Sequence, residues 1–495
     1  MSGRKQSVIL ALGSLTFNMR MVRMRRRHIG LAGAMLLSFT TATAAPAPTP
    51  YADNNGLKPP ASLYKGPLFK LSHAYPAKVA APAMPWRAAI RNGQIDTRNA
   101  AAYAQALKDA VGKDMKVLLG DYAHWDAAKR GWYNEPWLGS MNLYDPKHQY
   151  LGREAIHGMY VGSSELDASL FKQSGLTKDI TTYVLTYYDK VAAQTLNRIW
   201  KTKGPTDPYL TPDSTQFEEG ALIVKAAFIT AGPDVWPVMQ GTQVWPLYIN
   251  VDATANGNDT PTRLPKLTHA YLMQFDIIVK DSKSAPDTGW VFMTLVYDKN
   301  AKRGPNGIWD QMTVLGAQWG NDPQANSTVN PAAPLLQNWN NPKAPLYGGE
   351  TFGWGERLSG PNDGAMNNIA YTEDGQLKKV VNAKNSSCMS CHSTAQWNLA
   401  SKNMPSFLLP DLSNKPDMTD DHYLVSPPPG SPEWLRWFQN RRGNVPMDPG
   451  SIAGDFDMVL TFKSLPLMES AKSRQPHPLT GRDLRGKPAA APSGK

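Results

Sequence analysis

The run Trp290-Val-Phe-Met-Thr-Leu-Val-Tyr297 is almost entirely apolar and is rich in β-branched and aromatic residues. It follows the turn-forming stretch Pro286-Asp-Thr-Gly289, and a similar run, Met312 to Trp319, follows the turn sequence Gly304-Pro-Asn-Gly307. Short runs of this composition, bounded by Pro, Gly, Asn and Asp, predict β-strands. The two runs therefore predict neighbouring strands of an antiparallel sheet.

Further runs of the same kind precede this pair. They are Ala221 to Ile229, Val244 to Val251 and Ala270 to Lys280. Five runs within roughly 100 residues predict a central antiparallel β-sheet across residues 211–320.

The region upstream, residues 98–210, is expected to be partly helical. Arg98 to Val111 is Ala-rich with apolar residues at helical spacing, and Thr177 to Trp200 is an amphipathic run that ends before Gly204-Pro205. The expected fold class is α+β, with a partly helical N-terminal part, the central antiparallel sheet and a small helical C-terminal region.

The N-terminus has the features of an export signal. Met24-Arg-Arg-Arg-His28 is a charged stretch, Ile29 to Phe39 is a short apolar run, and Ala42-Thr-Ala44 is a small-residue cleavage site. We therefore expect residues 1–44 to be a cleaved signal peptide, and the mature protein to be periplasmic or secreted. Residues 45–97 are expected to be a flexible lead-in. No later run has 18 uninterrupted apolar residues, so no membrane span is expected in the mature chain.

The formal charge of +11 comes largely from the signal segment. Without its seven Lys and Arg residues, 45 basic residues face 41 acidic ones, a difference of +4. This balance gives no sign of a nucleic-acid partner, which would require clustered Lys and Arg on one face. Phosphate-binding loops and hydrolase motifs are also absent from the sequence.

The stretch Cys388-Met-Ser-Cys391-His392 contains both cysteines of the chain. Two thiols one helical turn apart can add to the two vinyl groups of a haem, and the adjacent His392 can then bind the iron. The pattern C-x-x-C-H is the attachment signal of a c-type haem. We therefore predict one covalently attached haem c, with Cys388, Cys391 and His392 as its binding residues.

Three other interpretations of the two cysteines remain open. A disulfide across so short a loop is strained. A thioredoxin-like redox pair requires the motif at a helix start after a strand, within a βαβ unit, and residues 370–388 give no clear strand of that kind. A structural zinc site requires four ligands, and the chain has no second cysteine pair.

The sixth iron ligand is predicted less directly. Met447, in the stiff sequence Val445-Pro-Met-Asp-Pro449, is the tentative distal ligand, because a thioether on the far side of the iron is common in electron carriers. Met458 is expected to pack in the core instead. The other downstream candidates are Met404, Met418, Met468, His422 and His477.

The remaining boundaries follow from composition. Residues 321–345 are rich in Asn, Pro and Ala and are expected to be a linker or loop. Residues 346–469 are expected to form a cytochrome c-like haem region. Residues 470–495 are rich in Pro, Lys and Arg and are expected to be a disordered tail.

The chain resembles an uncharacterised family of exported bacterial single-haem cytochrome c proteins. The segments that carry the resemblance are Arg153–Gly158, Gly289–Asp298, Leu315–Asp322, Arg357–Asn362 and Ser387–Ala395. The resemblance implies haem binding and single-electron transfer, and it implies no particular substrate.

Two main functions are compatible with these features. The first is a periplasmic electron carrier that exchanges electrons with redox partner proteins. The second is a haem-dependent small-molecule oxidoreductase or haem sensor with a pocket between the β-rich region and the haem. Candidate polar residues for such a pocket are His157 with Arg153 and Glu154, and His124 with Trp125 and Asp126. A third possibility is a binding module whose sheet docks a redox enzyme and whose haem receives the electrons.

Overall fold

The computed structural model describes residues 58–91, 93–136, 153–200, 208–249, 266–326, 333–398 and 423–461. The expected signal peptide and the expected tail lie outside these residues. So do five of the candidate iron ligands, namely Met404, Met418, Met468, His422 and His477.

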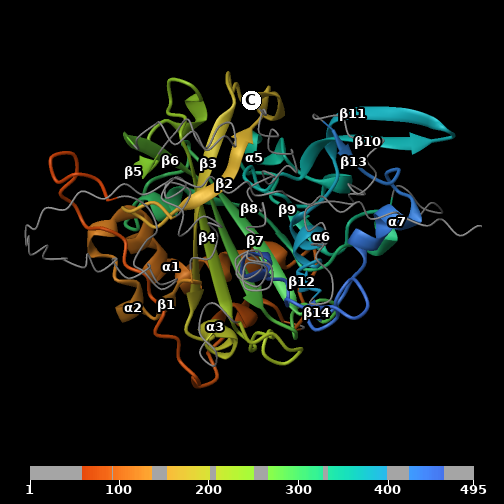
Figure 1. The fold of residues 1–495 in the computed structure, drawn as a ribbon, viewed down its shortest axis with the longest axis horizontal. Helices are drawn as coiled ribbons and strands as arrows, with labels where there is room; N and C mark the ends of the chain where they lie inside the picture. The colour runs from red at the N-terminus through yellow and green to blue at the C-terminus, as the bar shows by residue number, and fades with distance from the viewer. Residues whose placement is uncertain are drawn as a thin grey trace, which may run out of the picture. The chain divides into compact units, whose positions relative to one another are not determined.

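A nine-stranded antiparallel sheet forms the centre of the fold (Figure 1). The strand order is β1-β3-β4-β6-β7-β8-β9, with β2 paired to β3 and β5 paired to β6. The strands are β1 (Trp132–Tyr133), β2 (Tyr160–Leu166), β3 (Ile180–Asp189), β4 (Leu222–Ile229), β5 (Val244–Ile249), β6 (Lys266–Lys280), β7 (Trp290–Tyr297), β8 (Met312–Gln318) and β9 (Asn338–Asn340). The α+β class and the five strands expected between residues 211 and 320 are confirmed.

Two smaller sheets lie in the C-terminal region. One has the order β11-β10-β13, with β10 (Met366–Glu373), β11 (Gln376–Lys384) and β13 (Leu424–Val425). The other pairs β12 (Gln396–Trp397) with β14 (Ile452–Ala453). This region was expected to be small and helical, so its strands are a correction. The hairpin of β10 and β11, cyan in Figure 1, turns at Asp374-Gly375, and both residues have positive φ.

The helices are short except for one. The α-helices are α1 (Ala100–Gly120), α2 (Ala127–Arg130), α3 (Ala193–Trp200), α5 (Leu346–Gly349), α6 (Cys388–His392) and α7 (Pro432–Leu435). The 3-10 helices are η1 (Pro85–Ala89), η2 (Tyr122–His124), η4 (Ala168–Phe171), η5 (Pro237–Met239), η6 (Ile308–Gln311), η7 (Pro323–Asn326), η8 (Trp354–Glu356) and η10 (Arg436–Phe438). No helix among the described residues is both long and apolar enough to cross a bilayer.

The helix predicted over residues 177–200 is wrong in its first half. Residues 180–189 form β3, and only Ala193–Trp200 is helical. The strand sequence Ile-Thr-Thr-Tyr-Val-Leu-Thr-Tyr-Tyr-Asp is dominated by β-branched and aromatic residues, which lose side-chain freedom in a helix and pack well on a sheet. Seven consecutive pairs with β4, from Thr182↔Ile229 to Tyr188↔Ile223, then fix it as a strand.

Two segments expected to be loops also belong to the packed structure. In the expected lead-in, Trp86 is buried and its Nε1 donates a hydrogen bond to Asp281 at 2.9 Å. In the expected linker, β9 pairs with β8 at the register Ala317↔Trp339. Residue composition alone suggested loops. The first segment is held in the fold by the buried side chain of Trp86, and the second by pairing of β9 with the edge strand β8.

The two faces of the large sheet have different partners. Alternate residues of β4, Val224, Ala226 and Phe228, share a core with Tyr103 and Leu107 of α1. A second core covers the opposite face and includes residues from the C-terminal region. Its members include Ile223, Met273, Phe292, Leu315, Cys388, Met389, Cys391 and Phe456. Because both faces are covered, β7 is buried along its whole length, which explains its continuous apolar sequence.

Candidate haem attachment site

The motif residues lie on α6, whose N-terminus is capped reciprocally. Ser387 Oγ accepts a hydrogen bond from the N–H of Ser390 at 3.2 Å, and Ser390 Oγ accepts one from the N–H of Ser387 at 2.8 Å. Such a pair of bonds stabilises the first turn of a helix. Because residues three apart share one helix face, Cys388 and Cys391 lie on the same side of α6.

Gln318 of β8 fastens α6 to the large sheet. Its Oε1 accepts a hydrogen bond from Met389 N at 2.9 Å, and its Nε2 donates one to Ser387 Oγ at 3.3 Å. The N–H of Cys388 donates to the carbonyl of Leu358 at 3.0 Å. The first N–H groups of a helix have no partner within that helix. These contacts therefore complete α6 and fix the motif against β8.

Both cysteines are present as buried thiols. Burial, followed by the negative charge of Asp363, raises the pKa of Cys391 to about 12. The same two causes raise the pKa of Cys388 well above its usual value. Thiols that act in disulfide exchange have a lowered pKa. The environment of this pair is therefore unlike that of a redox-active dithiol.

A strand does precede the motif, but it is not the strand of a βαβ unit that a thioredoxin-like pair requires. The strand β11 ends at Lys384, four residues before Cys388. It pairs antiparallel with β10. The redox-pair interpretation requires a βαβ unit, in which the strands are parallel, and this hairpin does not provide one.

Within the described residues, one hydrogen bond holds the imidazole of His392. Its Nδ1 lies 2.8 Å from the carbonyl oxygen of Phe456. A carbonyl can only accept, so the proton is on Nδ1 and Nε2 retains its lone pair. Burial lowers the pKa of His392 to about 4, which keeps the ring neutral. Within the described part of the chain, Nε2 has no hydrogen-bond partner.

These residues fit a covalently attached haem. Two thiols share one helix face, and the following imidazole has the tautomer that binds a metal through Nε2. A carbonyl on the other ring nitrogen is the usual outer partner of such a histidine. Among the described residues, no three or more His, Cys, Asp or Glu side chains are arranged to hold a metal ion by themselves.

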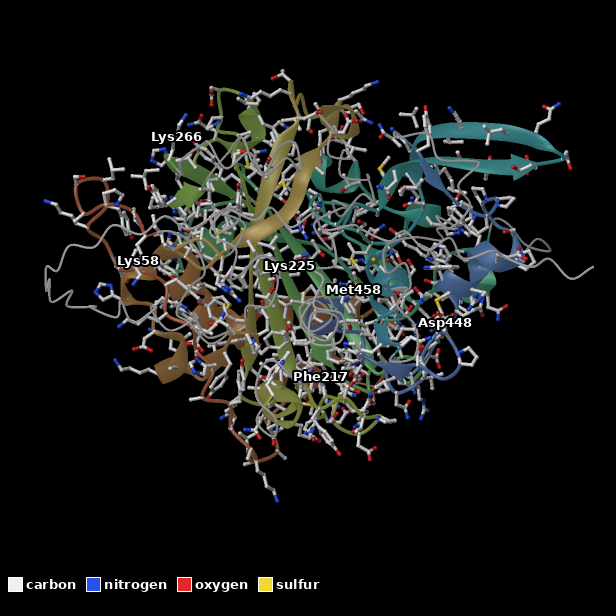
Figure 2. All side chains as sticks on the ribbon, in the orientation of Figure 1. Lys58, Phe217, Lys225, Lys266, Asp448 and Met458 are labelled. Carbon is white, nitrogen blue, oxygen red and sulfur yellow. The ribbon has the colours of Figure 1, made fainter. Side chains whose placement is uncertain are left out.

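A cluster of charged side chains lies beside Cys388. Lys225 Nζ lies 2.8 Å from Asp276 Oδ2 and 2.9 Å from Asp363 Oδ1, and Asp363 Oδ2 lies 3.8 Å from Cys388 Sγ. Figure 2 labels Lys225 on β4. Although burial alone lowers the pKa of Lys225, the two carboxylates raise it. Burial alone raises the pKa of Asp363, but Lys225 outweighs this and lowers it.

The tentative distal ligand Met447 lies in a different core from the cysteines. It is half-buried and packs against Ile369, Leu424, Trp434, Trp437 and Phe438. Met458, labelled in Figure 2, is buried in the same core as Cys388 and Cys391. Its position agrees with the core-packing role expected for it.

The two polar clusters proposed for a haem pocket lie away from the motif. His157 is 3% exposed and stacks on Trp245 with ring centroids 4.1 Å apart. Trp245 belongs to the core on the α1 face of the sheet, whereas the cysteines belong to the opposite core. His124 is exposed and contacts Asp121. The structure therefore does not bring either cluster to Cys388 and His392.

Several residues of the site could not be identified from the sequence. Gln318, Asp363 and Phe456 lie 71, 25 and 64 residues from the motif residues they contact. Nothing in their spacing relates them to α6, since the contacts depend on the folding of the sheet and the C-terminal segment. Comparison of the chain with protein-family models, with curated proteins and with solved structures finds no match.

Proposed function

We propose that the chain is an exported c-type cytochrome that carries one haem and transfers single electrons between periplasmic partner proteins. Cys388 and Cys391 would form the thioether bonds, and His392 would bind the iron. The observation that carries this proposal is the hydrogen bond from His392 Nδ1 to Phe456, which leaves the lone pair of Nε2 available one residue after the helix turn that contains both thiols. The bound haem would supply a reversible one-electron couple.

The resemblance to exported single-haem cytochromes supports the same function. Two of the segments that carry it, Leu315–Asp322 and Arg357–Asn362, contain Gln318 and Leu358, and both residues bind the N-terminus of α6. The resemblance therefore extends to residues that position the motif. Export, by residues 1–44, would deliver the chain to the compartment of its redox partners. Met447 is retained as the proposed distal ligand.

Covalent attachment can be tested directly. The full chain is expressed with a cytochrome c maturation system, and haem is detected on a denaturing gel. We expect haem to remain with the wild type, to be lost from the Cys388→Ala, Cys391→Ala double variant, and to remain with Met389→Leu, which keeps both thiols. Absence of covalent haem from the wild type would disprove the proposal.

The charged cluster beside Cys388 favours a second candidate, a haem-dependent small-molecule oxidoreductase or sensor. The side chains of Lys225 and Asp363 are 21% and 17% exposed, so polar groups reach solvent next to the motif. A carrier needs only an exposed haem edge, whereas a catalytic site needs such groups to bind substrate or move protons. Absorption spectra separate the two: a six-coordinate low-spin iron supports the carrier, and a high-spin iron that responds to peroxide or carbon monoxide supports the enzyme.

A further inference from the structure

Two consecutive residues beside His392 adopt a backbone conformation that L-residues rarely use. Asp455 and Phe456 have φ values of 47° and 66°. Neither is glycine, and for a bulky residue such as Phe this region is costly. Strain of this kind persists only where the surrounding contacts determine the conformation, and it is frequent at functional sites.

The contacts that determine it come from the large sheet. The carboxylate of Asp455 is completely buried. It accepts a hydrogen bond from Trp290 Nε1 at 2.7 Å and another from the N–H of Phe217 at 2.7 Å, and it pairs with Lys280. Trp290 begins β7 and Lys280 ends β6, and Phe217, labelled in Figure 2, precedes β4. Three separate parts of the sheet region therefore hold one carboxylate.

A second set of contacts ties the same segment to the end of the motif. The N–H of Gly454 donates to the carbonyl of Ala395 at 2.7 Å, and β14 pairs with β12 at Gln396↔Ala453. The carbonyl of Phe456 thus lies between a buried anchor on the sheet and the chain that follows α6. In this position it accepts the hydrogen bond of His392.

We propose that Asp455 is a positioning residue that holds the carbonyl of Phe456 against Nδ1 of His392 and so sets the tautomer and basicity of the iron-binding imidazole. The role of His392 as an iron ligand rests on the proposed function, but the contacts that position its imidazole involve only residues of this chain. It also assigns a role to the large sheet, which would act as the rigid support of the histidine.

The direction of the effect follows from the hydrogen bond. A carbonyl partner makes the imidazole a stronger donor, and a stronger donor stabilises ferric over ferrous iron. Loss of the outer hydrogen-bond partner of a metal ligand typically lowers metal affinity or activity by about tenfold or more. We expect Asp455→Asn to shift the redox equilibrium about tenfold toward the ferrous state, which for a one-electron couple is about 59 mV more positive.

Asp281→Asn is a matched control for this substitution. Asp281 is also a completely buried carboxylate that accepts an indole N–H, from Trp86 at 2.9 Å, and pairs with a cation, Arg87. Its hydrogen bond from Tyr103 places it against α1, on the other side of the sheet from His392. General destabilisation should therefore be similar in the two variants. Lys280→Met is a second variant, because it removes the ion pair and leaves the hydrogen bonds from Trp290 and Phe217 that hold Asp455 in place.

The test combines the midpoint potential with ¹⁵N spectra of histidine-labelled full-length protein. We expect the His392 signals of the wild type to show a fixed Nδ1–H tautomer. Asp455→Asn should shift both the signals and the potential, Lys280→Met should shift them in the same direction by less, and Asp281→Asn should leave them unchanged.

Equal His392 signals in Asp455→Asn and Asp281→Asn would overturn the inference. This outcome is distinct from failure of the proposed function, which would show as absence of covalent haem from the wild type. The ¹⁵N measurement would in that case still decide the role of Asp455, because it reports on the hydrogen bond and does not require iron.

Discussion

The ring of Phe292 lies 4.6 Å, centroid to centroid, from the imidazole of His392, with an angle of 55° between the ring planes. Phe292 is in the middle of β7, the strand whose sequence most clearly predicts the sheet. The contact means that the central sheet forms one wall of the candidate haem site. Packing of the sheet and orientation of the histidine are therefore linked.

Phe292→Ala tests this link. The side chain is 3% exposed, so its removal should leave a cavity and reduce the free energy of unfolding by about 3–5 kcal/mol. Phe275→Ala removes an equally buried ring from the α1 face of the sheet and should cost a similar amount. Urea denaturation measures both losses. Only Phe292→Ala should alter the His392 ¹⁵N signals, and an equal change in both variants would contradict the link.

The central strands could be predicted because burial on both faces leaves an unbroken apolar sequence, as in β7 and β8. The strand β3 could not be predicted, because its apolar residues also match a helical period. Its pairing with β4 decides that the segment forms a strand. The hairpin of β10 and β11 had a usable signal, Asp374-Gly375, which is a preferred hairpin turn. The short strands β1 and β9 carry no comparable signal.

The sequence predicts the motif residues because covalent haem attachment requires a fixed local spacing, and their role in binding haem stays a prediction. Their supports could not be predicted, since Gln318, Asp363 and Asp455 act through contacts that exist only in the folded chain. Asp455 illustrates the difficulty: an Asp before Phe has no sequence feature that indicates a left-handed backbone. The positive φ values and the buried carboxylate become visible only in the structure.

Gln318→Ala should loosen α6. The substitution leaves the buried N–H of Met389 without its partner, which should cost about 1–3 kcal/mol. Hydrogen exchange should therefore become faster for the amides of α6 and remain unchanged in α1. Gln311→Ala is a suitable control, because Gln311 is buried and donates one hydrogen bond, to Ala301, remote from α6. Unchanged exchange in α6 of Gln318→Ala would show that the Ser387 cap is sufficient.

Met447→Leu tests the tentative distal ligand. If Met447 binds the iron, the variant should lose the weak far-red absorption band of ferric haem ligated by Met, at little cost in stability because Leu is similar in volume. Met458→Leu, in the core that contains the cysteines, should keep the band. Loss of the band from Met458→Leu alone would transfer the role to that residue.

Asp363→Asn should destabilise the protein in a pH-dependent way. Removing one of the two carboxylates that pair with Lys225 should cost about 1–3 kcal/mol, because Lys225 still pairs with Asp276. The folded-state pKa of Asp363 is lowered by Lys225, so its stabilising contribution is present above the ordinary carboxyl pKa and is lost as pH falls through the lowered value. Unfolding free energies of wild type and variant should therefore differ at pH 7 and converge as pH falls through the lowered pKa of Asp363. A constant difference would show that the ion pair is not the cause.

Asp457 should give the opposite pH dependence. Burial raises its pKa to about 7, because it outweighs the backbone N–H groups and the Tyr188 hydroxyl, which favour the ionised form. The protonated form is therefore favoured by folding, and its contribution is complete below the ordinary carboxyl pKa and is lost as pH rises through about 7. We expect this residue to reduce the wild-type free energy of unfolding by on the order of 3 kcal/mol between pH 5 and 8.

Asp457→Asn should remove that loss, because an amide stays neutral and its Oδ1 can still accept the hydrogen bond of Leu460. Urea denaturation at pH 5 and pH 8 measures the difference. In Asp281→Asn the slope over this range should stay as in the wild type, because hydrogen bonds from Arg87, Tyr103 and Ser284 outweigh burial and lower the pKa of Asp281. If Asp457→Asn keeps the wild-type slope, Asp457 is already ionised in the folded protein at pH 5, and its hydrogen bonds from Tyr188 and the backbone outweigh burial.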